Sequence, residues 1–317
     1  MKCIMSFDVG GTNIKIGKFI FDEKKNDYVL DNNYYIKTIY GNSESLILNQ
    51  IKEEVIKNTS DCELKAIGIG VPGPVVNGVV LKAQNINWGI FNVKEELGKL
   101  FPGVSISVLN DANAATLGEW YYGTTDRVPN LVFVTLGTGI GGGIVVNGKL
   151  LEGANGSAGE IGHIKIFPFN GRPCTCGLHG CIEQYASATG IAITARGMIK
   201  NGPTSLKRKF RLNAKDVFDE ALKGDKIALE IVDKTCYYLG IALASIANTI
   251  NPNRIIIGGG VSKNGDILLN GVKKHFKELA FGSVRDTEIT LATLYNEAGI
   301  YGCFYKALED LSNDWYT

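Results

Sequence analysis

Apolar positions recur along the chain with two different periods, which predicts strands interleaved with helices. Residues 2–9 form a short and mostly apolar run, and a second strand is predicted at 13–21. Because only a glycine turn separates these two strands, they are expected to form a hairpin. Further buried strands are predicted at 66–71 and 105–109.

Helices are predicted where apolar residues recur every three or four positions. In the segment 44–58, for example, Ile47, Ile51 and Val55 would share one face. The segment 112–120 is rich in Ala, Leu and Glu, and these residues favour helix. Further helices are expected at 228–250 and 297–311.

The strand-turn-strand pattern of the N-terminus returns in the middle of the chain. An apolar strand at 131–136 leads into the glycine-rich run 137–143, and another strand is predicted at 144–146. Placing Gly137 on Gly10 aligns the flanking strands with each other and Asp8 with Thr135. This weak repeat and the alternation of strands with helices predict a mixed α/β fold in two halves with a cleft between them.

Composition argues against several classes of protein. The formal net charge is +1 over 317 residues, so no general attraction to nucleic acid or to a membrane surface is expected. The basic run Lys207-Arg208-Lys209 with Arg211 is typical of a solvated face. No apolar stretch reaches the roughly 18 residues of a membrane-spanning helix. The N-terminus lacks the apolar core of a signal peptide.

The seven cysteines fall into two groups. Three of them, Cys174, Cys176 and Cys181, form a tight cluster. The others stand singly in apolar surroundings, as small buried hydrophobic residues do in a reducing compartment. These are Cys3, Cys62, Cys236 and Cys303. A cytoplasmic protein is therefore expected.

Two glycine turns suggest phosphate binding. The run 137–143 contains the pattern G-x-G-x-x-G, but a dinucleotide site needs a helix directly afterwards, and 144–148 predicts strand and turn. Bare backbone N–H groups between two strands can line an anion site instead. The turn Gly10-Gly11-Thr12 offers the same device, and Asp8 beside it is placed to hold Mg²⁺. The alternative is that these glycines only make tight turns.

Two further strand ends carry candidate binding groups. Gly258-Gly259-Gly260 follows a predicted strand at 254–257 and allows close approach of a flat ligand such as adenine, or simply of strand to helix. In the pair Asn110-Asp111, one residue is sufficient to cap the following helix. Asp111 could then accept the proton of a sugar hydroxyl while Asn110 holds a neighbouring hydroxyl. A weak base is sufficient, because phosphoryl transfer depends mostly on positioning and charge neutralisation.

The most specific feature of the chain is His163 followed by the segment 174–181, which contains Cys174, Cys176 and Cys181 and is called the cysteine knuckle below. Three cysteines and one histidine suit a tetrahedral structural zinc site. Either His163 or His179 could be the fourth ligand, and we favour His163 because His179 lies inside the knuckle, where space is limited. The second ring nitrogen of His163 could then meet a sugar hydroxyl, with Glu160 and Glu183 close by. Either glutamate alone would be interpreted as an exposed charge.

Taken together, these motifs resemble the ROK family of repressors, open reading frames and sugar kinases, over essentially the whole chain. Within the family the sequence is most similar to the bacterial glucokinases, particularly those of Gram-positive type. The family's repressors carry a DNA-binding module ahead of the first phosphate turn, and no such module fits ahead of Asp8. The resemblance rests on Asp8-Val9-Gly10-Gly11-Thr12-Asn13, Gly70-Val71-Pro72-Gly73-Pro74, Asn110-Asp111, the segment 136–163, the cysteine knuckle with Glu183, and Gly258-Gly259-Gly260.

The resemblance implies an actin-like ATPase fold with two ribonuclease-H-like domains. The smaller domain would comprise 1–115 with the terminal helix 298–317, and the larger one 116–297. The implied activity is transfer of phosphate from ATP to the 6-hydroxyl of glucose, as in glycolysis, by a homodimer that uses Mg²⁺ and structural zinc. The implied base is Asp111, and the implied sugar ligands are Gly73, Asn110, Asp111, Glu160, His163 and Glu183. The implied ATP-binding residues are Asp8, on the magnesium side, Gly10, Gly11, Thr12, Asn13, Thr138, Gly139 and Gly259. The implied zinc ligands are His163, Cys174, Cys176 and Cys181.

Two alternative functions remain. A kinase for an N-acetylhexosamine, mannose, fructose or allose would need different room around the 2-position of the sugar, which motifs do not report. A non-catalytic sugar sensor is the other alternative. The presence of Asp8, Asp111 and both phosphate turns argues against a sensor, since a degenerate kinase would be expected to have lost some of them.

Overall fold

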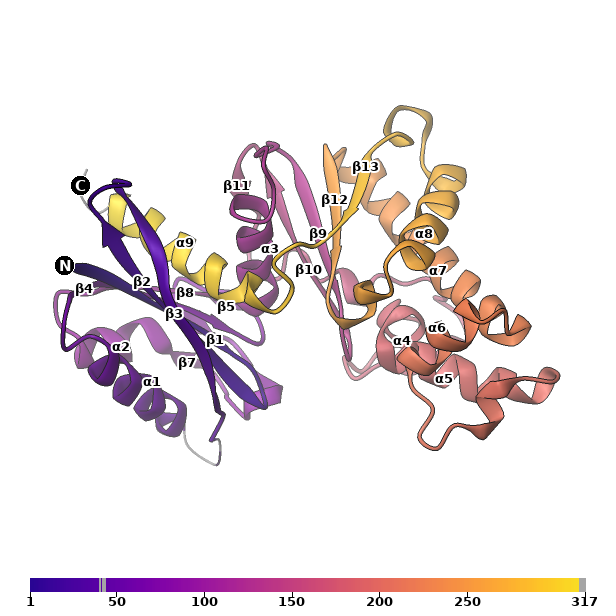
Figure 1. The fold of residues 1–317 in the computed structure, drawn as a ribbon, viewed down its shortest axis with the longest axis horizontal. Helices are drawn as coiled ribbons and strands as arrows, with labels where there is room; N and C mark the ends of the chain where they lie inside the picture. The colour runs from indigo at the N-terminus through magenta and orange to yellow at the C-terminus, as the bar shows by residue number, and fades with distance from the viewer. Residues whose placement is uncertain (40, 42–43, 314–317) are drawn as a thin grey trace. The chain divides into compact units, whose positions relative to one another are not determined.

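The computed structural model describes residues 1–39, 41 and 44–313. The chain divides into two compact units, each built around a five-stranded sheet (Figure 1). The first unit comprises 1–127, 150–158 and 296–317, and the second comprises 128–149 and 159–295. In the described part of the chain, we find no helix with the length and apolar character needed to cross a membrane.

The first sheet has the strand order β3-β2-β1-β4-β8. Its central strand β1 pairs antiparallel with β2 and parallel with β4, and β4 pairs parallel with β8. Three short strands, β5 to β7, form a separate sheet. The elements of the first unit are β1 (Lys2–Val9), β2 (Asn13–Asp22), β3 (Asp27–Lys37), α1 (Ser45–Asn58), β4 (Glu63–Val71), β5 (Val75–Val76), β6 (Val79–Val80), β7 (Phe91–Asn92), α2 (Val93–Leu100), β8 (Ser105–Asn110), α3 (Asp111–Tyr121) and α9 (Ala298–Asn313).

Burial on both faces explains the nearly continuous apolar character of β1. On one face, Phe7 packs in a cluster with Ile47 and Ile51 of α1. On the other, Ile4 packs in a cluster with Phe304 of α9. The predicted strands and helices of this unit are all present. Strand β3 was not predicted, because it is mostly exposed and shows no apolar alternation.

A disulfide bond joins Cys3 to Cys62, so the prediction that both are separate buried thiols is wrong. The parallel pairing of β1 with β4 places Cys3 opposite Leu64, which brings Cys62 close. The two cysteines lie 59 residues apart in sequence, and therefore no local pattern indicates their pairing. Cys236 and Cys303 are buried and carry no disulfide, as predicted.

The second sheet has the strand order β11-β10-β9-β12-β13. Strands β9 and β12 pair in parallel, and β9 pairs antiparallel with β10. The inward side chains of β9 and β12 form one core with helices α5 to α8. The elements are β9 (Leu131–Leu136), β10 (Ile140–Val146), β11 (Lys149–Leu150), α4 (Glu183–Ala186), α5 (Ala188–Met198), α6 (Ala214–Leu222), α7 (Lys226–Ile250), β12 (Arg254–Gly258), α8 (Asp266–Leu279) and β13 (Glu288–Leu291). Short 3₁₀ turns lie at Gln84–Ile86, Ile161–His163, Ile199–Asn201, Ser205–Arg208, Gly260–Asn264, Gly282–Val284 and Tyr295–Glu297.

Strand β10 begins at Ile140 and not at 144, so three successive glycines are strand residues. Glycine is depleted in strands, which is why the sequence suggested a loop here. A Cβ atom built on Gly142 would lie 2.4 Å from the Cδ1 atom of Ile161. The missing side chain therefore lets the 3₁₀ turn Ile161–His163 lie directly against β10.

Candidate functional site

The first predicted phosphate turn, residues 10–13, lies at the end of β1. The backbone N–H of Gly10 donates to the carbonyl of Asn13 at 2.9 Å, which closes a tight turn. Thr38, which follows β3, stabilises the turn because its hydroxyl donates to the carbonyl of Gly10 at 2.7 Å. Gly11 is partly exposed and Thr12 is exposed, so the tip of this turn remains accessible.

Asp8 lies just before this turn and has a cross-strand partner that the sequence analysis missed. In the β1–β2 hairpin Asp8 stands opposite Lys15, and the Lys15 ammonium donates to the Asp8 carboxylate at 2.8 Å. The Asp8 side chain is 14% exposed. Helix α9 comes so close that a Cβ atom built on Gly299 would lie 2.5 Å from Oδ2 of Asp8. The register of the hairpin was the signal that could have identified Lys15, because opposite charges face each other across the strands.

The Asn110-Asp111 pair lies where β8 passes into α3. The side-chain oxygen of Asn110 accepts hydrogen bonds from the backbone N–H groups of Ala112 and Asn113, at 2.9 and 3.1 Å, and thus caps the helix. Its amide also donates to the carbonyl of Gly73 at 3.1 Å. Asn110 therefore joins the helix start to the loop after β4, and one amide hydrogen is left for a ligand. Asp111, the first helical residue, is half-buried.

The fold brings Asp8 and Asp111 to the same edge of the first sheet. Asp8 and Leu109 are both in register with Gly70, which lies between them on β4. Neighbouring strands are about 4.8 Å apart, so the backbones at 8 and 109 are separated by about 10 Å. Burial, followed by the nearby Asp8 carboxylate, raises the pKa of Cys303 well above its usual value, and Asp111 contributes in the same direction. Both carboxylates therefore act on one buried thiol.

The second phosphate turn, between β9 and β10, contains Thr138 and Gly139. The N–H of Gly137 donates to the carbonyl of Gly139 at 3.0 Å. A Cβ atom on Gly139 would lie 2.8 Å from a carboxylate oxygen of Glu183, so that side chain lies against the turn. Gly259 has a φ of +83° and packs on the backbone of Leu136. A Cβ atom built on Gly259 would lie 2.5 Å from the Leu136 carbonyl oxygen. Close packing of β12 on β9 thus accounts for Gly259 without a ligand.

His163, Cys174, Cys176 and Cys181 form the cysteine–histidine cluster that the sequence predicted. One ligand atom from each lies within 4.8 Å of all the others. The sulfurs of Cys176 and Cys181 are 3.6 Å apart, and Cys174 Sγ lies 3.7 Å from His163 Nδ1. A tetrahedral zinc ion about 2.3 Å from each sulfur holds two sulfurs about 3.8 Å apart. The donor set and its spacing therefore fit zinc.

The surroundings of the cluster influence the charge of its sulfur atoms. Burial raises the pKa of the Cys174 thiol to about 12, and a bound cation would offset this effect and deprotonate the thiol. The Lys165 ammonium donates to Cys181 Sγ at 2.6 Å. His179 is exposed and lies outside the cluster, so the choice of His163 as fourth ligand is consistent with the structure.

The knuckle also positions three of the predicted sugar ligands. Because Nδ1 of His163 faces the sulfurs, its Nε2 faces away, 3.8 Å from a carboxylate oxygen of Glu160. Glu183 is tied to the cluster from the other side, since Cys174 Sγ donates to its carboxylate at 3.1 Å. Glu160 and the His163 ring are partly exposed and accessible to a ligand. The second unit thus brings together Glu160, His163, Glu183 and the second phosphate turn.

Comparisons with known proteins identify the family of the chain. The model of the ROK family matches residues 4–310. A glucokinase of Halalkalibacterium halodurans is 43% identical over 93% of this chain and 92% of its own length. A glucokinase of Thermotoga maritima is 35% identical over 94% of this chain and 95% of its own.

Solved structures show the same fold. The ROK family glucokinase of Streptomyces griseus, crystallised with glucose and AMPPNP, is 31% identical to this chain. It matches with a TM-score of 0.78 over 97% of this chain and 99% of that one. The predicted class, a mixed α/β fold of the actin-like ATPase type, is confirmed. The chain belongs to the ROK family.

Proposed function

We propose that this protein is an ATP-dependent glucokinase that transfers the γ-phosphate of ATP to the 6-hydroxyl of glucose. The observation that carries the proposal is the edge of the first sheet, where two carboxylates with different surroundings lie two strands apart. Asp8 is paired with an ammonium group beside a phosphate turn, and Asp111 stands at a helix start. Full-length similarity to bacterial glucokinases supports the same conclusion.

In this mechanism Asp111 is the general base. Its carboxylate accepts the proton of the 6-hydroxyl as that oxygen bonds to the γ-phosphorus and the bond to the β-phosphate oxygen breaks, which releases ADP. Asn110 and the backbone at Gly73 hold sugar hydroxyls in the first unit. Glu160, His163 and Glu183 are the sugar ligands of the second unit.

The nucleotide is held by the two turns. Gly10, Gly11, Thr12 and Asn13 contact phosphates through backbone and side-chain donors, as do Thr138 and Gly139, and Gly259 lies near the nucleoside. Mg²⁺, when bound, neutralises phosphate charge, and Asp8 is the carboxylate that holds it directly or through water.

The cysteine–histidine cluster binds structural zinc. Bound zinc would hold His163 through the ring nitrogen that faces the sulfurs, and the Nε2 of His163 would then be free to meet a sugar hydroxyl. We further propose that the two units correspond to the two domains of the fold, that the protein is a homodimer and that it acts in the cytoplasm, where ATP is available.

A coupled ADP-release assay over hexoses and N-acetylhexosamines tests the proposal. Glucose should be the preferred acceptor, and preference for an acetylated sugar would favour the alternative kinase. Asp111→Asn should lower kcat about 10²- to 10⁴-fold while sparing sugar binding. Asp286→Asn, at an exposed carboxylate, is the matched control and should leave kcat unchanged. Absence of turnover on every sugar would refute the kinase assignment.

A further inference from the structure

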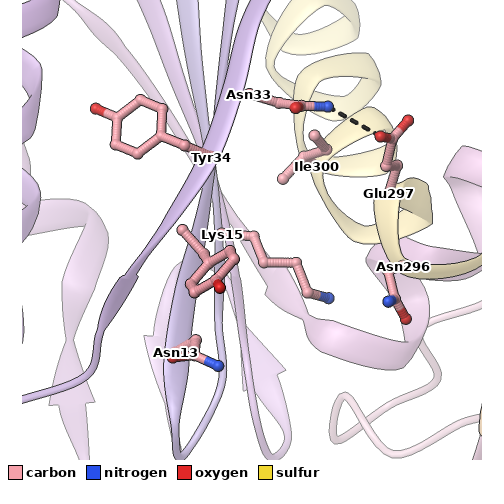
Figure 2. Close-up of a pocket in the computed structure, with 8 residues that line it drawn as sticks. Asn13, Lys15, Asn33, Tyr34, Asn296, Glu297 and Ile300 are labelled. Atoms are coloured by element: carbon pink, nitrogen blue, oxygen red, sulfur yellow. Dashed lines mark hydrogen bonds between the residues drawn. The ribbon is translucent and has the colours of Figure 1, made fainter.

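A cavity of about 290 Å³ lies in the first unit, beside the first phosphate turn but separate from Asn110 and Asp111. Its polar lining comes from the β2–β3 hairpin and from the 3₁₀ turn Tyr295–Glu297, which directly precedes α9 (Figure 2). The lining side chains that matter are Asn13, Lys15, Asn33, Tyr35, Asn296 and Glu297. Ile300 supplies an apolar wall between them.

Strand geometry explains why these side chains converge. Lys15 stands opposite Tyr35 across the hairpin, and Asn33 lies two residues before Tyr35 on the same face. Tyr34 points to the other face, where its hydroxyl donates to Glu54. In Figure 2 the ring of Tyr34 accordingly points away from α9, while the Lys15 ammonium extends toward Asn296.

The charges of the lining favour a neutral ligand. Among the described residues that line the cavity, Lys15 is the one cation, and it is already 2.8 Å from the Asp8 carboxylate. Glu297 adds a carboxylate, which accepts from the Asn33 amide at 3.0 Å. A phosphorylated ligand would bring about two negative charges next to Asp8 and Glu297, and this repulsion disfavours it.

The remaining groups are those that a polyol needs. Three asparagine amides offer donors and acceptors, and the Glu297 carboxylate accepts from hydroxyl groups. Tyr35 is 71% exposed, which leaves an aromatic face available for the apolar side of a sugar ring. The volume is at the lower limit of small-molecule sites, where a monosaccharide fits and a nucleotide does not.

We propose that this cavity is a second sugar site, which binds a neutral hexose and is distinct from the acceptor site of the reaction. Sugar oxygens accept from the hydrogens of the Lys15 ammonium that Asp8 does not use. The bound sugar thereby holds the Lys15–Asp8 pair in place and lowers the KM for MgATP at high sugar concentration. One additional hydrogen bond to a charged group corresponds to a change of about ten- to a hundredfold. The effect on KM, but not the binding itself, rests on the proposed kinase activity.

Equilibrium dialysis with radiolabelled glucose, with no nucleotide present, tests the binding. The intact protein should bind glucose in two phases, a tight and a weak one. Asn33→Ala and Tyr35→Ala should each remove the weak phase and leave kcat and the KM for glucose at low concentration unchanged. Tyr237→Ala, at a partly exposed tyrosine of the second unit, is the matched control and should keep both phases. Circular dichroism confirms that each variant is folded.

The outcomes separate this proposal from the kinase assignment. A single binding phase in the intact protein, or a weak phase that survives in both cavity variants, would overturn the second site even if turnover is normal. Glucose 6-phosphate that displaces the weak phase more strongly than glucose would also overturn it, because the cavity would then be an anion site. If the protein binds glucose in two phases but phosphorylates no sugar, the second sugar site is supported and only the kinase assignment is refuted.

Discussion

Gly299→Ala tests whether the placement of Asp8 matters for ATP. A Cβ atom at Gly299 would lie 2.5 Å from Oδ2 and 2.6 Å from Cγ of Asp8, whereas ordinary contact begins at 3.4 Å. The carboxylate must therefore move by about 0.9 Å, or α9 must shift. Overpacking of this kind costs about 1–3 kcal/mol. The Lys15 pair that would be disturbed is partly exposed and adds less than about 1 kcal/mol.

Gly98→Ala in α2 is the matched control. It is the same substitution in the same unit, and no atom lies within 4 Å of the added Cβ. Alanine in a helix interior is favoured over glycine by up to about 1 kcal/mol, so this variant should be slightly more stable than the unmodified protein. Gly299→Ala should accordingly unfold about 1–4 kcal/mol more easily than Gly98→Ala.

Steady-state kinetics measures the effect of Gly299→Ala on the use of MgATP, and thermal unfolding measures its effect on stability. A displacement of about 1 Å in a catalytic group can cost 10²-fold, so kcat/KM for MgATP should fall by up to that factor in Gly299→Ala. The KM for glucose should change little, because Asp8 is proposed to act on the nucleotide side. If Gly299→Ala matches Gly98→Ala in both stability and MgATP kinetics, the close contact with Asp8 is not real or Asp8 has no role.

Three further predictions concern metal, redox state and pH. Metal analysis should find about one zinc per chain, lost or reduced in Cys176→Ser and retained in His179→Ala; full zinc in Cys176→Ser would refute the cluster. Oxidised protein should titrate five thiols when denatured, and seven after reduction. Reduction of the Cys3–Cys62 bond should lower the Tm, because closing a 59-residue loop contributes about 4 kcal/mol in the chain-entropy model. The Tm of Cys62→Ser should not change when reductant is added. Hydrogen bonds from Ser205 and two lysines lower the pKa of Glu220 from 4.5 to about 2. Because the pKa of Glu220 is lower in the folded state, the stabilisation that its charge provides is complete above about pH 4.5 and is lost toward pH 2. The Tm of Glu220→Gln should therefore fall less steeply across this range than the Tm of the unmodified protein. Equal slopes would contradict this assignment.

The sequence predicted the elements whose pattern is set by a buried face. Helix α1 and strand β1 are examples, because each packs an apolar surface on a neighbour. Strand β3 escaped prediction because it is an edge strand that exposes most of its side chains. The disulfide escaped for a different reason, since strand pairing across 59 residues joins its cysteines.

The candidate site shows the same division between local and long-range information. The cysteine cluster was predictable because three of its four ligands lie within eight residues of sequence. The helix cap at Asn110 is also local. Lys15 required the register of the hairpin, and the contact of Gly299 with Asp8 joins the two ends of the chain. No sequence pattern at Gly299 indicates such a partner.

Among the differences between the two hairpins of the internal repeat, one residue pair just before the turn bears on their chemistry. In the first hairpin Asp8 faces Lys15, whereas in the second the aligned residue, Thr135, faces Gly141. The first hairpin can therefore hold a cation through its carboxylate, with an ammonium group close by to contact phosphate or sugar oxygens. The second has no charged side chain in that pair and can offer a ligand only backbone and hydroxyl groups. Because Lys15 is paired with the carboxylate that is proposed to hold the metal, Lys15→Met should raise the KM for MgATP far more than Thr135→Val.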